Sequence, residues 1–272
     1  MTVPSYVSGP STQPLIGETI GENLRRVVER FPDREALVVV NQKHRATYRQ
    51  FWEATSQVAR GLMVRGVKKG DRVGIWAPNR SEWVEAQYAT ARMGAILVNI
   101  NPAYRVHELE NALKHSGVST LILAKGFRQA NYVEMVREIR MKVPELKQTI
   151  VIDEEWADLK HDAQRLSEES LHDVERALQF DDASNIQYTS GTTGFPKGAT
   201  LSHHNILNNG YFIGEFLRYT EKDRVCIPVP LYHCFGMVLG NLAITTHGAA
   251  KTSIRARSRS SSSPTRPSAR SR

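Results

Sequence analysis

Apolar residues near the start of the chain recur at the spacing of an amphipathic helix. In the stretch 18–31 they lie 4, 7, 8 and 11 positions after Ile20, and a proline follows at position 32, which is one helix face and then a residue that cannot continue the helix. Thr47 and Gln50 have the spacing of a capping box ahead of a second periodic stretch, which a glycine ends at position 66. The pattern therefore predicts two helices, with a short buried strand at 37–40 between them.

Downstream, short apolar runs alternate with helix-like stretches. Strands are predicted at 72–76, 95–100, 118–124, 149–152, 185–189 and 224–229. Helices are predicted at 81–93, 106–115, near 131–141, from about 202 to 217, and at 235–246. The charged stretch 153–181 is predicted to be a surface connection with some helix. This alternation predicts an α/β fold of mostly parallel sheets flanked by helices on both faces.

The segment 189–198 follows a predicted strand and contains three glycines, three threonines, a serine and a lysine. Glycines let a backbone approach a ligand closely, hydroxyl groups add hydrogen-bond donors, and Lys197 adds a mobile positive charge, which together suit a polyphosphate. The spacing is not that of a Walker A loop, because Pro196 stands where that pattern requires glycine, and no G-x-G-x-x-G fingerprint is present. For a generic loop of this composition the alternative is a flexible surface turn.

Positive charge is concentrated at the C-terminal end of the chain. The formal net charge is +8, but residues 251–272 contain seven basic and no acidic residues, which leaves 29 of the 36 basic residues against all 28 acidic ones. A basic groove for nucleic acid is therefore excluded for residues 1–250. Ser, Arg and Pro dominate the stretch 251–272, a composition that cannot bury a core, so this tail is predicted to be disordered.

Cysteine usage and hydropathy set further limits. Cys226 and Cys234 are too few for a disulfide framework and do not form a C-x-x-C pair. No apolar run reaches the roughly 18 residues that a membrane-spanning helix requires, and the N-terminus lacks the basic start of a secretory signal. These observations predict a cytoplasmic protein in a reducing compartment, without a membrane span.

The string Tyr-Thr-Ser-Gly-Thr-Thr-Gly-Phe-Pro-Lys-Gly at 188–198 resembles the AMP-binding signature of the adenylate-forming superfamily. The segments 46–51, 70–80, 91–104 and 228–236 are similar to other segments of that superfamily, so the resemblance covers roughly residues 15 to 250. The strings Asn-Pro-Ala-Tyr at 101–104, Ala-Thr-Leu-Ser-His-His-Asn at 199–205 and Pro-Leu-Tyr-His-Cys at 230–234 look most like the medium-chain fatty acyl-CoA synthetase branch. The chain thus resembles the N-terminal part of such a synthetase.

The resemblance implies a two-step ligase whose substrates are a fatty acid, ATP with Mg²⁺, and CoA. The carboxylate attacks the α-phosphate of ATP to give an acyl-adenylate, and the CoA thiol then displaces AMP. His233 matches a position that lines the acyl and adenylate pocket, with a core histidine as the alternative, while no catalytic residue and no metal ligand is assigned. The residues that match the ATP-phosphate loop are Thr189, Ser190, Gly191, Thr192, Thr193, Gly194, Phe195, Pro196 and Lys197, the last as a phosphate clamp.

Family elements that lie further along a complete synthetase are not found in this sequence. They include a Tyr-Gly-x-Thr-Glu string, a ribose-binding aspartate and the lysine of a small C-terminal domain. We therefore expect a flexible N-terminus at 1–14, a partial AMP-binding domain at 15–250 and a tail foreign to the family at 251–272, in a truncated or frameshifted, inactive form. Such a form is expected to expose apolar surface and to associate with chaperones. The alternatives are a nucleic-acid-binding protein that uses the Arg/Ser-rich tail, and a regulatory ATP-binding fragment that associates with a full-length synthetase.

Overall fold

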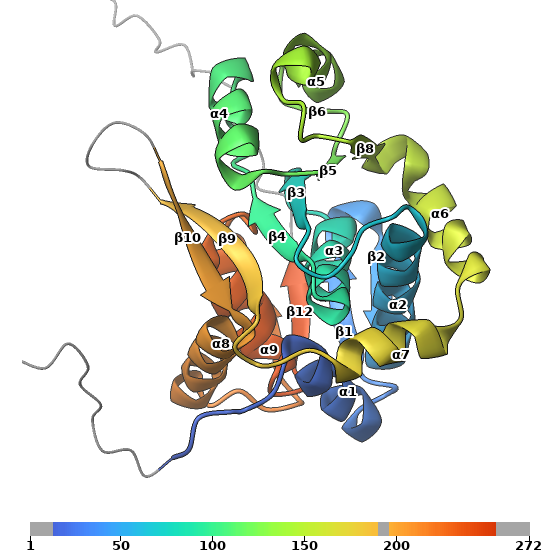
Figure 1. Ribbon diagram of the computed structural model, residues 1–272. Helices are drawn as coiled ribbons and strands as arrows, with labels where there is room; N and C mark the ends of the chain where they lie inside the picture. Colours follow the sequence, from blue (N-terminus) through green and yellow to red (C-terminus); the bar gives the residue numbers. More distant parts are fainter. Residues whose placement is uncertain (1–12, 190–195, 254–272) are drawn as a thin grey trace, which may run out of the picture.

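The computed structural model describes residues 13–189 and 196–253 (Figure 1). Its α-helices are α1 (Ile20–Arg30), α2 (Tyr48–Val64), α3 (Ser81–Met93), α4 (Val106–Ser116), α5 (Tyr132–Ile139), α6 (Ile152–Asp162), α7 (Glu168–Arg176), α8 (His203–Leu217) and α9 (Ala243–Thr245). The shorter 3₁₀ helices are η1 (Val40–Gln42), η2 (Arg140–Lys142) and η3 (Ala163–Arg165), and η4 (Phe235–Leu242) is a π-helix. The strands are β1 (Glu35–Val39), β2 (His44–Thr47), β3 (Arg72–Trp76), β4 (Ile96–Asn99), β5 (Thr120–Leu123), β6 (Gly126–Phe127), β7 (Ala130–Asn131), β8 (Gln148–Val151), β9 (Ala183–Thr189), β10 (Lys197–Ser202), β11 (Arg224–Cys226) and β12 (Ala250–Ser253).

Two larger sheets form the framework. The six-stranded sheet has the order β10-β9-β4-β3-β5-β8, and its strands are parallel except for β10, which pairs antiparallel with β9. The four-stranded sheet has the order β11-β12-β1-β2, in which β12 runs parallel to both of its neighbours and β2 antiparallel to β1. A third, two-stranded sheet pairs β6 with β7. The predicted α/β class with mostly parallel sheets is confirmed.

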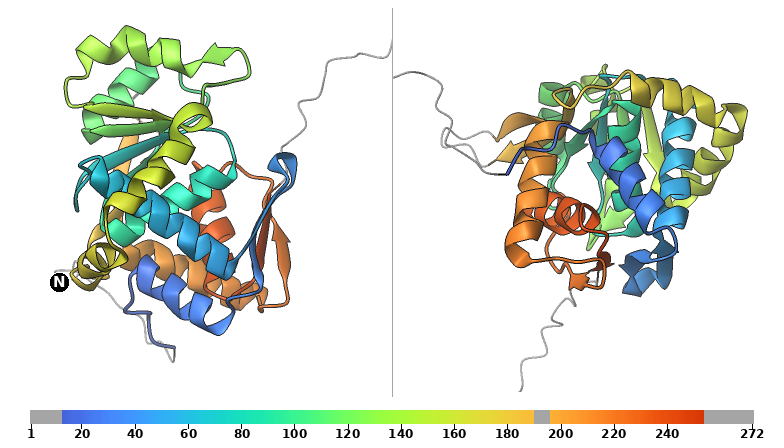
Figure 2. Two further views of the ribbon diagram at one scale, coloured as in Figure 1. Left: turned by 90° about the vertical axis from the view of Figure 1, so that its right-hand side faces the viewer. Right: turned by 90° about the horizontal axis from the view of Figure 1, so that it is seen from below.

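Helix α3 lies between the two larger sheets (Figure 2). It packs against β3 and β4 of one sheet and against β1 of the other. Glu82 is the only one of its 13 residues that is not buried, so this helix has no solvent-facing side, which is expected of a helix at the centre of a domain. Alanines at positions 86, 89 and 91 keep the helix thin enough for a sheet to pack on either side of it.

Local sequence explains where several elements begin and end. The boundaries of β3 and α3 are those that the sequence predicts. Capping boxes, in which the side chains of the first and fourth residues satisfy each other's backbone N–H groups, begin three helices. These are Thr19 with Glu22 at α1, Thr47 with Gln50 at α2 as predicted, and Ser202 with Asn205 at α8.

Three segments differ from the sequence-based expectation. The stretch 153–181, predicted to be a surface connection with some helix, contains more helix than expected, in α6, η3 and α7. The segment 197–202, for which the sequence predicts no strand, forms β10, because its backbone pairs with β9 and not because its side chains are apolar. Strand β12 continues through Ser253, three residues past the expected boundary at 250. The rest of the predicted tail, 254–272, and most of the predicted flexible N-terminus, 1–12, lie outside the described residues.

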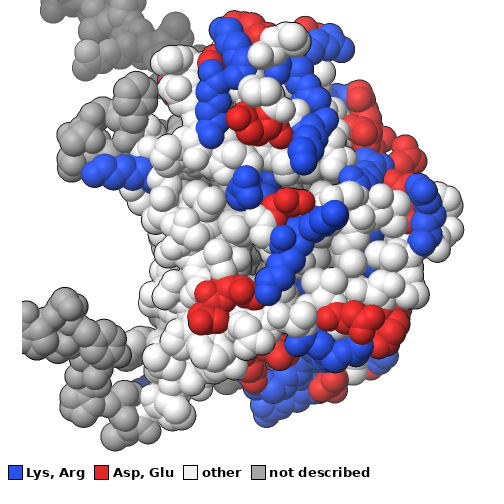
Figure 3. Space-filling model, viewed as in Figure 1, with Lys and Arg blue, Asp and Glu red and all other residues white. Residues whose placement is uncertain are grey.

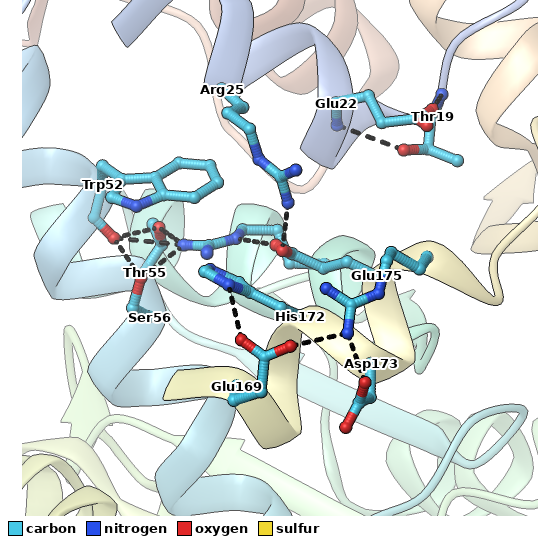
Figure 4. A network of polar contacts seen from close by, with 12 residues as sticks. Thr19, Glu22, Arg25, Trp52, Thr55, Ser56, Glu169, His172, Asp173 and Glu175 are labelled. Carbon is cyan, nitrogen blue, oxygen red and sulfur yellow. Dashed lines mark hydrogen bonds and ion pairs between the residues drawn. The ribbon is translucent and has the colours of Figure 1, made fainter. Parts of the chain in front are cut away.

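Arg92 joins three of the helices through a buried side chain, and Figure 4 labels its partners Trp52, Thr55, Ser56 and Glu175. Its guanidinium is fully buried, and Nε donates to Glu175 Oε1 of α7 at 2.6 Å. Nη1 donates to the hydroxyl oxygens of Thr55 and Ser56 on α2, at 2.9 and 2.7 Å. The guanidinium carbon also lies 3.4 Å from the centre of the Trp52 ring. Arg92 therefore fixes α7 and α2 to the central helix α3.

The segment before α1 is held against α8. Asn208 Oδ1 accepts from the Ile16 N–H at 2.7 Å, and the Asn208 amide donates to the Ile16 carbonyl at 3.0 Å. His203 is fully buried at the start of α8, and its Nδ1 accepts from the Ile20 N–H at 3.2 Å. This contact supports a structural role for His203, as its place at a helix start suggests.

The buried His203 makes the stability of the protein depend on pH. Burial lowers its pKa to about 4, although nearby Asp182 acts in the opposite direction. The unfolded chain therefore binds more protons than the folded chain between pH 6.5 and 4, and stability is lost as the pH falls through this window. We expect the free energy of unfolding to fall by about 2 kcal/mol between pH 7 and pH 5 on account of this residue. Urea titrations of the unsubstituted protein and of His203→Asn check this, since the variant should lose that share of the pH dependence; identical slopes would contradict it.

Candidate functional site

The predicted phosphate loop connects the two strands of a hairpin. Thr189 pairs with Lys197 and Tyr188 with Gly198, and the Thr189 hydroxyl donates to the Lys197 carbonyl at 3.4 Å. Thr189, Pro196 and Lys197 are exposed, and Lys197 makes no ion pair with any of the residues that the structure describes. The other predicted phosphate-loop residues, Ser190, Gly191, Thr192, Thr193, Gly194 and Phe195, lie outside the described residues.

The surroundings of this hairpin carry few charges. In Figure 3, Lys, Arg, Asp and Glu side chains gather over the right-hand side of the molecule, and the hollow left-hand side, where β9, β10 and α8 lie in Figure 1, is nearly free of them. On this face few carboxylates lie around the hairpin to compete with an anion for the ammonium group of Lys197, although Glu108 lines the cavity next to the hairpin.

Helix α4 anchors the root of the hairpin. The Tyr188 hydroxyl donates to the Ala112 carbonyl at 2.9 Å and lies 3.2 Å from His115 Nδ1. Burial raises the pKa of Tyr188, so the phenol stays protonated and keeps donating. A cavity of about 660 Å³ lies between α4 and the hairpin, and Tyr104, His107, Tyr188 and Pro196 are among its lining residues.

A chain of buried amide side chains crosses from β9 to β4 below the loop. Asn185 lies opposite Leu97, and Gln187 lies opposite Asn99. The Asn185 amide donates to Asn99 Oδ1 at 3.0 Å, and the Asn99 amide donates to Gln187 Oε1 at 3.1 Å. The Gln187 amide then donates to the Tyr232 carbonyl at 2.7 Å. These contacts tie the strand that leads into the loop to the turn that carries His233.

The turn that carries His233 is closely fixed from the other side as well. Asn79 donates to the Val229 carbonyl and accepts from the Leu231 N–H, both at 2.8 Å. Gly236 passes so close to this turn that a Cβ atom there would lie 2.3 Å from the Pro230 carbonyl oxygen. Residues other than glycine are therefore excluded at position 236, the second residue of η4.

His233 is exposed, so the alternative of a buried core histidine is wrong. Its Nδ1 accepts from the Phe235 N–H at 3.1 Å. Because Nδ1 is occupied as an acceptor, the proton of the neutral ring sits on Nε2, which can donate to a ligand. The Cys234 sulfur lies 3.7 Å from Nδ1.

A second, larger cleft of about 1480 Å³ lies at the carboxyl ends of β3, β4 and β5, where ligands of parallel sheets usually bind. Asn79, Asn101 and Tyr232 line it, together with the basic side chains of Arg80, Lys125, Arg128 and Arg137. Among the described residues no group of three His, Cys, Asp or Glu side chains is placed to hold a metal ion.

Sequence reasoning missed the polar residues that position the site. Asn99 ends β4 and Gln187 lies within β9, both of them buried, and Asn79 lies in the segment that follows β3. A buried amide in an apolar strand requires a hydrogen-bond partner, and this signal could have singled out Asn99, which ends an apolar run.

The mostly parallel sheets are those that the resemblance implies, and the profile of the family described as AMP-binding enzyme matches residues 24–265. The chain belongs to that family. It is 41% identical over 265 residues to the mitochondrial medium-chain acyl-CoA ligase ACSF2 of Danio rerio, covering 90% of this chain and 44% of that protein. It is also 41% identical over 256 residues to the putative acyl-CoA synthetase YngI of Bacillus subtilis (strain 168), covering 87% of this chain and 47% of that protein.

The fold is similar to solved structures of the same kind. The inhibitor-bound N-terminal domain of FACL13 from Mycobacterium tuberculosis superposes with a TM-score of 0.74 at 26% identity, covering 87% of this chain and 57% of that one. The chain spans about half the length of the curated relatives it matches. No helix within the described ranges is long and apolar enough to cross a membrane. The cytoplasmic location stays a prediction, and the ACSF2 relatives are named as mitochondrial proteins.

Proposed function

We propose that this chain carries the ATP-phosphate and carboxylate side of the active site of a fatty acid–CoA ligase. The observation that supports this most is the hairpin of β9 and β10, in which exposed Lys197 stands at the root of the loop. The chain of buried amides ties the turn of His233 to β9, the strand that leads into this loop. The acyl-CoA ligases among its relatives suggest the substrate class.

The first step of such a ligase brings a negative carboxylate toward a negative phosphate. Catalysis therefore depends on positioning and on positive charge around the phosphates. In this proposal Lys197 binds the phosphates, and the Thr189 hydroxyl at the other end of the loop turns from the Lys197 carbonyl to donate to a phosphate. His233, with its proton on Nε2, donates to the carboxylate or to the acyl phosphate.

Magnesium and CoA are family substrates whose binding by this chain is likewise proposed. Mg²⁺ is usually bound by one or two carboxylates together with substrate phosphates, and in this proposal the ion arrives with ATP, bound by its phosphates. For CoA we propose the large cleft at the strand ends. Its cations Arg80, Lys125 and Arg137 already pair with carboxylates, whereas Arg128 makes no ion pair within the described ranges and is the candidate for a CoA phosphate.

We also propose the domain arrangement suggested by the sequence, with a partial AMP-binding domain that begins near residue 15 and, after β12, extends to residue 253. In this proposal the complete ligation requires family elements that this chain does not carry. ATP–pyrophosphate exchange with a panel of fatty acids of different lengths is therefore expected to give no signal above background. Exchange that depends on Lys197 would contradict this and mean that this portion of the fold suffices for adenylation.

Binding of MgATP tests the phosphate site directly. Substituting Lys197→Ala should weaken MgATP binding roughly tenfold or more, since a charge-assisted hydrogen bond to phosphate is lost. Isothermal titration calorimetry measures this, with Lys222→Ala as the matched control because Lys222 is another exposed lysine in a turn away from the hairpin. Equal affinity of both variants and the unsubstituted protein would contradict the assignment of Lys197.

A further inference from the structure

Gln187 occupies an unusual position in the six-stranded sheet. It is 6% exposed, lies on β9, and stands two residues before Thr189, where the described part of the phosphate hairpin ends. A buried polar side chain in a sheet is tolerated when its hydrogen bonds are satisfied, and it then fixes one arrangement of its partners. The hydrogen-bond partners of Gln187 therefore show which parts of the fold this side chain holds in one arrangement.

Both ends of the Gln187 amide are used, and they connect different parts of the fold. Oε1 accepts from the Asn99 amide at 3.1 Å, while Nε2 donates to the Tyr232 carbonyl at 2.7 Å. The Asn99 amide also reaches the same Tyr232 carbonyl at 3.1 Å, and Asn99 is 1% exposed. One backbone carbonyl thus receives two buried donors from two neighbouring strands.

That carbonyl belongs to the residue immediately before His233. The next backbone groups begin η4, since the His233 carbonyl accepts from the N–H groups of Gly236 and Met237 at 2.8 and 3.1 Å. Rotation of the Tyr232 peptide would therefore move the His233 ring and the start of η4 together. Asn79 holds the turn farther back, at Val229 and Leu231, and leaves this peptide to the two amides.

We infer that Gln187 is a positioning residue, which sets the place of the Tyr232–Cys234 turn, and with it His233, relative to the strand that leads into the phosphate loop. The inference rests on the proposed function, because in that function Gln187 fixes the position of the carboxylate-binding part of the site relative to the phosphate-binding part. The positioning of the Tyr232–Cys234 turn by Gln187 does not depend on a bound ligand.

The two cysteines of the chain allow a test that needs neither ATP nor fatty acid. Cys234 lies in the turn and is partly buried, whereas Cys226 is exposed on β11. Two single-cysteine proteins, Cys226→Ser and Cys234→Ser, each report one position through the rate of labelling by a thiol reagent such as DTNB. Gln187→Met removes both hydrogen bonds at nearly constant side-chain volume.

Gln187→Met should accelerate labelling of Cys234 roughly tenfold, which is the effect of losing a buried hydrogen bond, and should leave the labelling of Cys226 unchanged. The matched control is Gln148→Met, because Gln148 also donates two hydrogen bonds from a strand of the same sheet, to Arg65 and Thr120 on the far side. This control should change neither rate.

Either of two results would overturn the inference. An unchanged rate at Cys234 would mean that Asn99 and Asn79 hold the turn without Gln187. Equal acceleration at Cys226 and Cys234 would mean that Gln187 supports the fold as a whole and not the turn. A failure of the proposed function would instead appear as absent MgATP binding in the unsubstituted protein, with the labelling result unaffected.

Discussion

Replacing Lys251 with methionine should raise the free energy of unfolding by about 4 kcal/mol at pH 7. Lys251 lies on β12 between Leu37 of β1 and Val225 of β11, is 2% exposed, and its Nζ has no hydrogen-bond partner among the described residues. Burial lowers its pKa from 10.5 to about 7. Methionine fills a similar volume without an amine that must be neutralised or buried as a cation.

The pH dependence gives this prediction a second readout. Between pH 7 and 10.5 the unfolded chain holds a proton on Lys251 that the folded chain does not, so stability rises with pH in this window, by about 1.4 kcal/mol per unit. Urea unfolding at pH 7 and pH 9 should show this gain in the unsubstituted protein and its absence in Lys251→Met. Lys222→Met, at an exposed position, serves as the control. A variant no more stable than the parent would mean that the ammonium reaches solvent.

Substituting Glu175→Gln should lower the free energy of unfolding by about 3–5 kcal/mol, because it leaves the buried guanidinium of Arg92 without a counter-charge. The two side chains are 0% and 5% exposed. Burial already lowers the pKa of Arg92 despite the neighbouring carboxylate, which indicates how little water reaches this cation. Urea unfolding at pH 7 measures the loss.

Arg25 provides the matched control for this pair. It also donates to Glu175, at 2.5 Å, but its side chain is 38% exposed. Arg25→Gln should therefore cost less than about 1 kcal/mol, as exposed ion pairs do. The double substitution of Arg92→Met with Glu175→Leu should recover most of the loss, because no charge is then buried. Similar small losses from Glu175→Gln and Arg25→Gln would contradict the prediction.

The parts of the fold that sequence could predict are those specified by local chemistry. The helix α2 begins where Thr47 and Gln50 form a capping box, and α3 ends at Met93 before Gly94, whose φ of 73° suits glycine. Apolar strands such as β3 stand out because they are buried on both faces. In each case the element can be predicted from residues that are close together in the sequence.

The parts that could not be predicted depend on partners far along the chain. Strand β10 is polar and exposed, and it is a strand because β9 pairs with it. Lys251 starts a stretch that reads as a polar tail, yet strands on both sides enclose it. No periodicity within a short window contains this information, since it comes from tertiary contacts that override local preference.

For the candidate site, the sequence could predict the residues proposed to bind ligand, but not the residues that hold them in position. Lys197 and His233 could be picked out because the family motif contains them, and the structure leaves both exposed. Gln187 and Asn79 could not, because their role depends on the backbone groups that they meet far along the chain. The functions of Lys197 and His233 themselves stay predictions until binding is measured.

The pairing of β1 with β12 has a consequence for how the protein is made. Strand β1 has β2 on one edge within a few residues, but its other edge waits for β12, about 210 residues later. At the usual speed of translation that interval takes about 10 to 40 s. During this time the nascent chain presents an open, apolar strand edge of Leu37 to Val39, which a ribosome-bound chaperone or a neighbouring nascent chain can pair with. Slow codons between these strands would lengthen this exposure, and faster ones would shorten it.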